Sequence, residues 1–263
     1  MMDSVNYYGS LCTEMYELLH SQAPQDELAF YLSYAHPGDR VLELLCGSGR
    51  FLVPFVQRGF DITGVDLSQE MLEKLLQKYP AAKVHRCSAD AFESEERFDY
   101  IFISSGSVSL FTDPALCQRV LQKAHDLLAP GGVFVFAVDT VSSAEQGDGT
   151  YQEVCSRTTP EGQLLKLKMN YRYDGQTQIQ YSPSIYERWD GEKLLQSEQM
   201  DFQTRLYQLG ELDGLLHKAG FASGRCMTDL TNIWRRTAAT GCSSMSAVDA
   251  ACQTRTTKEG AVV

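Results

Sequence analysis

Residues 41–49, Val-Leu-Glu-Leu-Leu-Cys-Gly-Ser-Gly, form the segment that most restricts what this chain can fold into. The segment reads as a short buried strand that runs through an acidic residue into a glycine-rich turn. Gly47 and Gly49 have no Cβ, so backbone N–H groups at the turn can approach a ligand closely. A helix that begins after the turn would point its N-terminus at that ligand. The pattern predicts the first strand and helix of a parallel βαβ unit.

A second acidic residue indicates that the ligand is a nucleoside. Asp66 ends the next apolar run, about twenty residues after the turn, where a βαβ unit places the group that binds ribose hydroxyls. Leu52 stands where a dinucleotide fingerprint needs its third glycine, and no Gly-Lys-Ser/Thr follows for a P-loop. The sequence therefore predicts a nucleoside cofactor and disfavours a nicotinamide-dependent oxidoreductase.

Strands and helices alternate through the first half of the chain. An apolar run at 98–104 lies between two helical patterns, one that starts at Ser68 and one that starts at Pro114. A further apolar run, at 133–138, follows the second helical pattern. This alternation predicts an α/β fold with a doubly wound, mainly parallel Rossmann-like sheet. After residue 140 the chain has short alternating runs separated by Asp-Gly pairs, which are strong hairpin signals. We expect an inserted antiparallel β meander of three or four strands there.

These patterns divide the chain into four expected parts. They are an N-terminal helical cap over residues 1–36, a cofactor-binding core over 37–140 and 206–238, an inserted meander or lid over 141–205, and a flexible tail over 239–263. The last two core strands are expected at 221–229 and 233–236. The tail has few large apolar residues, so it is not expected to bury enough apolar area to offset the cost of ordering its backbone.

The composition of the chain limits which partners the protein is expected to bind and in which cellular compartment it is expected to work. The formal net charge of −11 disfavours non-specific attraction to nucleic acid. No run approaches the ~20 apolar residues that span a bilayer, and the N-terminus lacks the blocks of a signal peptide. The eight cysteines include no Cys-x-x-Cys pair, so no structural zinc site is expected. We expect a cytoplasmic protein with free thiols, no bound metal, and no nucleic acid or membrane partner.

Five motifs in a fixed order carry a resemblance to a known family. They are Glu43 with Gly47-x-Gly49, then Asp66, then Asp90, then Phe98-Asp99-Tyr100-Ile101, then Leu127-Leu128-Ala129-Pro130-Gly131-Gly132. The chain resembles the class I S-adenosylmethionine-dependent methyltransferases of the small-molecule type, from about residue 7 to residue 238. The resemblance implies the seven-strand sheet of that family, S-adenosyl-L-methionine as cofactor, and methyl transfer to a nitrogen or oxygen of a small metabolite.

The resemblance also implies which residues bind the cofactor. Glu43 would bind the methionine amino group, Asp66 would accept hydrogen bonds from both ribose hydroxyls, and Asp90 would accept from the adenine amino group. Met71 suits a core position as well as a place on adenine. The full implied set is Glu43, Cys46, Gly47, Gly49, Asp66, Leu67, Met71, Asp90, Ala91 and Ser104.

The sequence says less about the identity of the methyl acceptor than about the cofactor. A sulfonium methyl is already electrophilic, so positioning supplies most of the catalysis. The small, hydroxyl-rich run at 104–111 resembles that of small-molecule N- and O-methyltransferases, and it lacks the His or Tyr that some sugar-amine members carry near Leu110. Tyr8 and Tyr16 are the candidate catalytic residues, with ordinary helix packing an equal alternative. A non-catalytic S-adenosylmethionine sensor is the alternative function, and the chain is expected to be a monomer or a homodimer.

Overall fold

The computed structural model describes residues 6–221, 223–227 and 250–255. Strands and helices alternate in its first half, as the sequence predicts. In order they are α1 (Ser10–Leu19), α2 (Gln25–Leu32), β1 (Arg40–Leu44), α3 (Leu52–Gln57), β2 (Asp61–Asp66), α4 (Gln69–Lys78), β3 (Lys83–Arg86), β4 (Phe98–Ile103), α5 (Pro114–Leu127) and β5 (Leu128–Val138). Short 3₁₀ turns lie at η1 (Ala89–Ala91), η2 (Ser107–Leu110) and η3 (Val141–Ser143).

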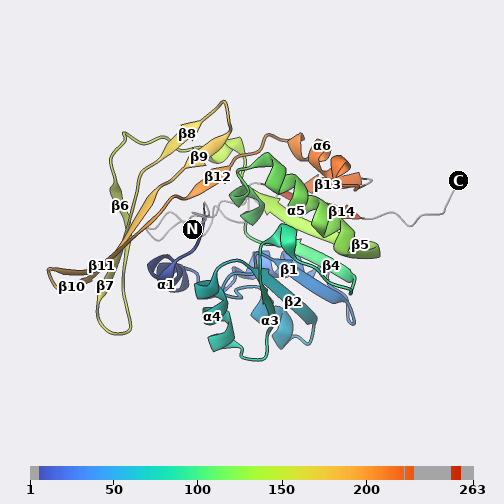
Figure 1. The fold of residues 1–263 in the computed structure, drawn as a ribbon, viewed down its shortest axis with the longest axis horizontal. Coiled ribbons are helices and arrows are strands. Elements are labelled where there is room, and N and C mark those ends of the chain that lie inside the picture. The colour runs from blue at the N-terminus through green and yellow to red at the C-terminus, as the bar shows by residue number, and fades with distance from the viewer. Residues whose placement is uncertain (1–5, 222, 228–249, 256–263) are drawn as a thin grey trace, which may run out of the picture.

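A seven-stranded sheet forms the centre of the fold, in the order β13-β14-β5-β4-β1-β2-β3 (Figure 1). The five strands from β5 to β3 are parallel, which confirms the predicted doubly wound, mainly parallel sheet. β1 lies between β2 and β4, so the chain leaves β1 toward one side of the sheet and later returns to the other. Ligands of open α/β sheets bind at such a switch point, outside the carboxyl ends of the strands.

The two remaining strands are antiparallel and correct one prediction. β13 (Ser223–Met227) falls where a strand was expected, but β14 (Ala250–Arg255) lies in the stretch predicted to be a flexible tail. β14 pairs with β5 from Ala250 opposite Val138 to Arg255 opposite Val133. Backbone hydrogen bonds of a ladder do not depend on large apolar side chains, so composition was a poor guide here. The strand expected at 233–236 and the rest of the predicted tail lie outside the described residues.

The segment after β5 forms two antiparallel sheets instead of a single meander. One sheet has the order β11-β10-β7-β6 and the other β12-β9-β8, so the insertion holds more strands than expected. The Asp174-Gly175 and Asp190-Gly191 turns connect paired strands, as predicted. The bounds are β6 (Gln152–Thr158), β7 (Leu164–Met169), β8 (Arg172–Asp174), β9 (Ile179–Tyr181), β10 (Ser184–Asp190), β11 (Lys193–Met200) and β12 (Gln203–Arg205), followed by α6 (Glu211–Lys218).

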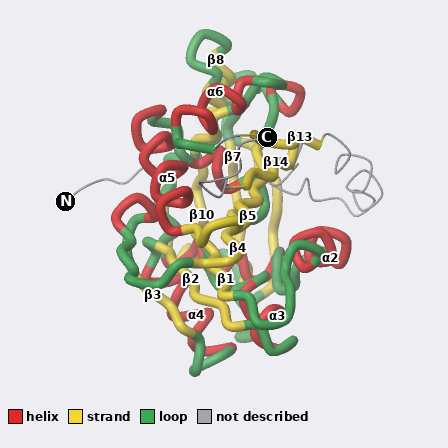
Figure 2. Tube along the Cα trace, turned by 90° about the vertical axis from the view of Figure 1, so that its right-hand side faces the viewer, coloured by secondary structure: helices red, strands yellow, loops and turns green. Residues whose placement is uncertain are grey.

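Helices cover both faces of the central sheet, as the tube in Figure 2 shows. Apolar side chains of α5 and α6 pack on one face, and those of α2, α3 and α4 pack on the other. A third apolar cluster joins α1 to the four-stranded sheet through Leu11, Met15, Leu165 and Tyr186. In Figure 1 α1 lies between that sheet and α4, and α1 contacts both. The N-terminal helix therefore connects the insertion to the core.

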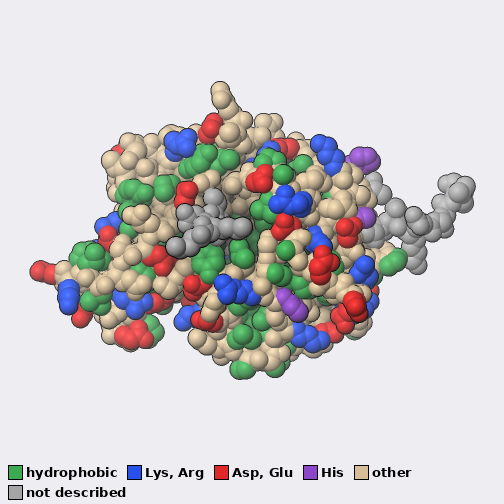
Figure 3. Space-filling view, viewed as in Figure 1, with side chains coloured by type: hydrophobic (Ala, Val, Ile, Leu, Met, Phe, Trp, Pro, Cys, Tyr) green, Lys and Arg blue, Asp and Glu red, His purple; other side chains and the backbone are tan. Residues whose placement is uncertain are grey.

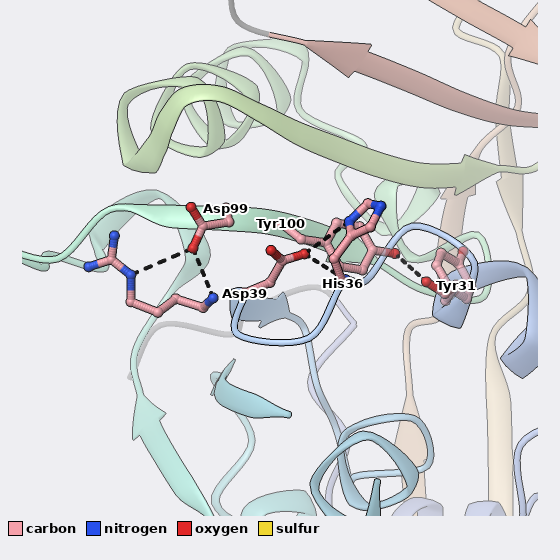
Figure 4. A network of polar contacts seen from close by, with 6 residues as sticks. Tyr31, His36, Asp39, Asp99 and Tyr100 are labelled. Carbon is pink, nitrogen blue, oxygen red and sulfur yellow. Dashed lines mark hydrogen bonds and ion pairs between the residues drawn. The ribbon is translucent and has the colours of Figure 1, made fainter. Parts of the chain in front are cut away.

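Buried tyrosines attach α2 to the carboxyl half of β4 (Figure 4). The Tyr100 hydroxyl donates to the Tyr31 carbonyl at 3.0 Å, and the Tyr31 hydroxyl donates to the Ile103 carbonyl at 3.3 Å. At the other end of β4, Asp99 accepts from the Arg40 backbone N–H at 2.9 Å. Buried phenol hydroxyls need such partners. The tyrosine contacts therefore fix α2 against β4.

The surface carries charges of both signs. On the face in Figure 3, Lys and Arg side chains are interspersed with Asp and Glu. Among the described helices, none is long and apolar enough to cross a membrane.

Candidate active site

A cavity of about 410 Å³ opens at the carboxyl ends of the parallel strands. Residues that follow each of the five strands line it, from Gly47 after β1 to Asp139 after β5. The N-terminal segment and the inserted strands form its other walls. These walls include Tyr8, Cys12, Met15, Tyr16 and His20 from the N-terminal segment, and Leu167, Tyr186, Phe202 and Thr204 from the insertion. The cavity thus lies where the sheet topology places ligands.

The glycine turn after β1 is held in a left-handed conformation. Leu45, Gly47 and Gly49 all have positive φ, at 59°, 52° and 80°. A Cβ on Gly49 would come within 2.7 Å of Leu75 Cγ, so glycine is needed there for packing as well as for φ. Gly49 faces α4, while Gly47 lines the cavity. Of the two glycines, only Gly47 is therefore placed to contact a ligand.

Asp66 joins the turn after β1 to the start of α4. Its Oδ2 accepts from the Gly47 backbone N–H at 2.8 Å, and its Oδ1 accepts from the Ser68 backbone N–H at 2.9 Å. Burial raises the pKa of Asp66, while these backbone bonds oppose the rise. Ser68 in turn caps α4, because its Oγ accepts from the Met71 N–H at 3.1 Å. Asp66 also lines the cavity, so these hydrogen bonds hold its carboxylate in place beside the space that a ligand would occupy.

A buried polar cluster lies below the other side of the turn. Ser105 donates from both N and Oγ to Glu27 Oε1, each at 3.0 Å, and Arg50 donates to the same Oγ. The Arg50 guanidinium lies 5.7 Å from the centre of the Tyr16 ring. Burial raises the pKa of Glu27, and the Arg50 charge counteracts this. The cluster holds Ser105, at a positive φ of 54°, against the cavity.

Glu43 lies beneath the turn and is 1 % exposed. Its Oε1 accepts from Ser104 Oγ at 3.1 Å, and no described group bonds its Oε2. Burial raises the pKa of Glu43 well above its usual range. Glu43 and Ser104 therefore support the turn and the end of β4 from below, without forming part of the cavity wall.

Residues 41–132 match the family described as "Methyltransferase domain". The segment holds the turn, Asp66 and the first four strands of the sheet. This part of the chain is therefore a methyltransferase domain, and the chain as a whole is similar to S-adenosylmethionine-dependent methyltransferases.

The similarity to known proteins extends beyond this segment. The "Putative methyltransferase YqeM" of Bacillus subtilis is 22% identical over 83% of this chain and 88% of its own length. The "dTDP-3-amino-3,4,6-trideoxy-alpha-D-glucopyranose N,N-dimethyltransferase" of Streptomyces venezuelae is 22% identical over 62% of this chain and 68% of its own. The structure of the sugar N-methyltransferase KedS8 from a Streptoalloteichus species superimposes with a TM-score of 0.72, at 18% identity, over 98% of this chain and 99% of that one. This last similarity shows that the whole fold, insertion included, is shared.

The structure brings only part of the predicted cofactor set to the cavity. Of that set, Gly47, Asp66, Leu67 and Met71 line it, and so do the candidate catalytic residues Tyr8 and Tyr16. Met71 is also 3 % exposed, so it serves the core as well. The predicted residues outside the wall are Glu43, Cys46, Gly49, Asp90, Ala91 and Ser104.

Asp90 has other partners in the methyltransferase. Its carboxylate accepts from Ser88 Oγ and, at 2.9 Å, from Arg119 Nε. Although burial raises the pKa of Asp90, these two donors lower it below its usual value. Ser88 and Ala89 line the cavity in its place. Cys46 likewise packs inward, where its Sγ would be 2.7 Å from a Cβ on Gly64.

Several cavity residues were missed from the sequence. Arg50 follows the glycine turn directly, which was an available signal, but His20 had none, and neither had Glu27, which supports the wall from behind Ser105. Burial, with a contribution from Arg50, lowers the pKa of His20 to about 4. Tyr186 of the insertion also lines the cavity. No group of three or more metal-binding side chains occurs within the described ranges.

Proposed function

We propose that this methyltransferase transfers the methyl group of S-adenosyl-L-methionine to a nitrogen or oxygen of a small metabolite. The observation that carries the proposal is the Asp66 carboxylate, held on the cavity wall by the Gly47 and Ser68 N–H groups. A carboxylate fixed in this way can accept from two ribose hydroxyls without reorganising. The cavity that it faces is enclosed by α1 and the insertion, which suits a small acceptor better than a polymer.

The wall residues suggest how the cofactor would lie. Adenine would pack beside Leu67 and Met71, with Ser88 and Ala89 at its edge. In this arrangement Asp90 acts on the adenine end by orienting Ser88. The methionine end would lie over Gly47, with Glu43 below the turn and Arg50 beside it. When bound, the cofactor supplies an electrophilic methyl group, and the protein's part is to align the acceptor with it.

Tyr8 and Tyr16 are better suited to binding than to proton abstraction. Burial raises the pKa of both phenols, so they stay protonated at neutral pH. Their rings lie 6.1 Å apart in an edge-to-face arrangement on the cavity wall. A phenol ring offers a π face to a cation such as a sulfonium. We therefore propose that they hold the cofactor's reactive end.

We propose that the insertion determines acceptor choice more than cofactor affinity. Its residues Leu167, Tyr186, Phe202 and Thr204 line the cavity. In the proposed arrangement the cofactor lies over the turns after β1–β3, which leaves these residues nearer to the acceptor. We also propose a cytoplasmic location, with which the free thiols of Cys12, Cys46, Cys87, Cys117 and Cys155 are consistent.

The test of this function is cofactor binding by an Asp66→Asn variant. Loss of charge-assisted hydrogen bonds should weaken S-adenosylhomocysteine binding by about 1.5–3 kcal/mol, roughly 10- to 150-fold, in calorimetry. Asp61→Asn is the matched control, because Asp61 lies at the opposite end of β2 in an exposed ion pair with Lys83. An unchanged dissociation constant for Asp66→Asn would remove Asp66 from the ribose role.

A further inference from the structure

Four buried polar atoms beside the turn after β1 and the end of β4 have no hydrogen-bond partner among the described residues. They are Glu27 Oε2, Glu43 Oε2, Ser48 Oγ and Arg50 Nε. Buried polar groups in folded proteins are nearly always hydrogen-bonded, so a group of unpartnered ones beside a cavity indicates a place where a ligand brings polar groups of its own. Of these four side chains, Arg50 reaches the cavity wall. The ligand group that suits Arg50 therefore identifies what binds at this end of the cavity.

The Arg50 side chain is fixed in position, but no described anion lies within ion-pair distance of it. Arg50 is 8 % exposed, and its guanidinium lies 5.7 Å from the centre of the Tyr16 ring and 5.1 Å from that of Phe51. One Nη donates to Ser105 Oγ. None of the ion pairs between described residues includes Arg50. A buried cation costs free energy unless an anion meets it, so this position favours a negatively charged ligand group.

Glu27 holds Arg50 in this place through Ser105. The Ser105 hydroxyl donates to Glu27 Oε1 at 3.0 Å, and the Ser105 N–H donates to the same oxygen at 3.0 Å. A hydroxyl has a single hydrogen, so donating to Glu27 turns its lone pairs toward other donors, and Arg50 is the donor that they receive. Glu27 lies outside the cavity wall, so it orients Arg50 without covering the side that faces the cavity.

The sheet topology places Arg50 at the methionine end of the cofactor. β1 lies between β2 and β4, Asp66 ends β2, and Ser105 follows β4. If the ribose binds at Asp66, as proposed above, the methionine portion crosses the turn over Gly47 and reaches Arg50. That portion carries one carboxylate, and Arg50 is the single Lys or Arg side chain among the described lining residues. The one anion of this portion thus meets the one cation of the described wall.

We propose that Arg50 binds the carboxylate of the cofactor's methionine portion, and that Glu27 is the positioning residue that holds Arg50 for this contact. This inference rests on the proposed methyltransferase function and adds the group that recognises the amino-acid tail. A guanidinium is planar and presents its N–H groups in a fixed fork, so it can donate to both carboxylate oxygens at once. The site should therefore discriminate strongly against a nucleoside thioether that lacks the carboxylate.

Two ligands that differ by the carboxylate test the inference without turnover. S-adenosylhomocysteine and its decarboxylated form, in which a hydrogen replaces the carboxylate, are each titrated into the protein by calorimetry. The wild type should bind S-adenosylhomocysteine about tenfold or more tightly, the worth of one hydrogen bond to a charged group. The decarboxylated ligand has the larger positive charge, and the chain has a formal net charge of −11, so long-range attraction works against this preference. A preference for the carboxylate thus has a local origin.

Arg50→Gln should remove most of this preference, by weakening the binding of S-adenosylhomocysteine far more than that of the decarboxylated ligand. The matched control is Arg58→Gln, because Arg58 lies exposed just beyond the C-terminus of α3, where it donates to the Pro54 carbonyl at 2.8 Å. Glu27→Ala should also reduce the preference, whereas Glu27→Gln keeps an oxygen that accepts from Ser105 and should restore it. A purely structural role for Glu27 would weaken the binding of both ligands equally.

Each failure has a distinct meaning. Wild-type protein that binds S-adenosylhomocysteine without preferring it to the decarboxylated form would overturn this inference alone. A preference that survives Arg50→Gln, or is lost in Arg58→Gln, would also overturn it, and equal weakening of both ligands by Glu27→Ala would overturn the positioning role. Wild-type protein that binds neither ligand would contradict the proposed function itself. Should Arg50→Gln fail to fold, Arg50→Lys supplies the second variant, since an ammonium keeps the charge but not the fork and should lower the preference.

Discussion

The Glu198 carboxylate on β11 caps the N-terminus of α1 across 187 positions of sequence. It accepts from the backbone N–H groups of Leu11 and Cys12, each at 3.0 Å. The residue at the N-cap position, Gly9, has no side chain to do this, and a Cβ there would come within 2.8 Å of Glu198 Oε1. The insertion therefore stabilises the helix that carries Met15 and Tyr16 into the cavity.

Replacing the capping acid should destabilise the protein. Glu198→Ala leaves the first N–H groups of α1 without a partner, and we expect a loss of about 1–3 kcal/mol in the free energy of unfolding. Urea denaturation followed by circular dichroism measures it. The control is Glu192→Ala, in the exposed turn between β10 and β11, which should change stability by less than about 0.5 kcal/mol. Equal stability of the two variants would show that the cap contributes nothing.

Two glycines have similar φ angles but different surroundings. Comparing their alanine variants therefore separates the cost of backbone strain from the cost of overpacking. Gly49 and Gly59 have φ of 80° and 86°, but a Cβ would meet Leu75 at 2.7 Å in the first case and nothing within 4 Å in the second. Gly59→Ala should cost roughly 1–2 kcal/mol from the left-handed backbone alone. Gly49→Ala should cost about 1–3 kcal/mol more, from overpacking against α4. Matching urea midpoints would show that α4 moves aside without cost.

Removing β14 should be far more damaging than its composition indicates. A chain that ends at residue 249 loses the strand between β5 and β13, and with it the ladder hydrogen bonds on both sides. Each of these hydrogen bonds contributes a net stabilisation of about 0.5–1 kcal/mol, so the free energy of unfolding should fall by on the order of several kcal/mol. The control is a chain that ends after Arg255. Thermal melting compares the two, and similar melting temperatures would argue that β14 adds no stability.

The pH dependence of stability should contain a contribution from His20. Burial and Arg50 lower its pKa from 6.5 to about 4 in the folded protein. Between these values the unfolded chain binds a proton that the folded protein does not, so stability falls as the pH falls from 6.5 to 4.

Replacement with glutamine isolates this contribution. The pH profile of His20→Gln, measured by urea denaturation, should fall less steeply than that of the wild type, by up to about 3 kcal/mol across this range. His36→Gln is the control, since the His36 side chain is 77% exposed. Parallel profiles for wild type and His20→Gln would exclude the effect.

Local signals explain why much of the core was predictable. The Ser68 cap, the Asp-Gly hairpin turns and the spacing from Gly47 to Asp66 each involve residues close in sequence, and the structure contains all three. Asp90 shows where such local signals end. Asp90 turns to Arg119, which lies 29 residues further on, and no local pattern distinguishes that ion pair from a ligand contact.

The sequence by itself determined the parallel sheet and the glycine turn after its first strand, because strand periodicity, glycine positions and βαβ spacing are properties of short segments. Tertiary structure alone decided which side chains share the cavity. Glu27 meets Ser105 across 78 positions, and β14 enters the sheet from a stretch that composition marked as a tail. Such contacts depend on how distant elements pack, and the free energy that selects them comes from pairing and burial that no single segment contains.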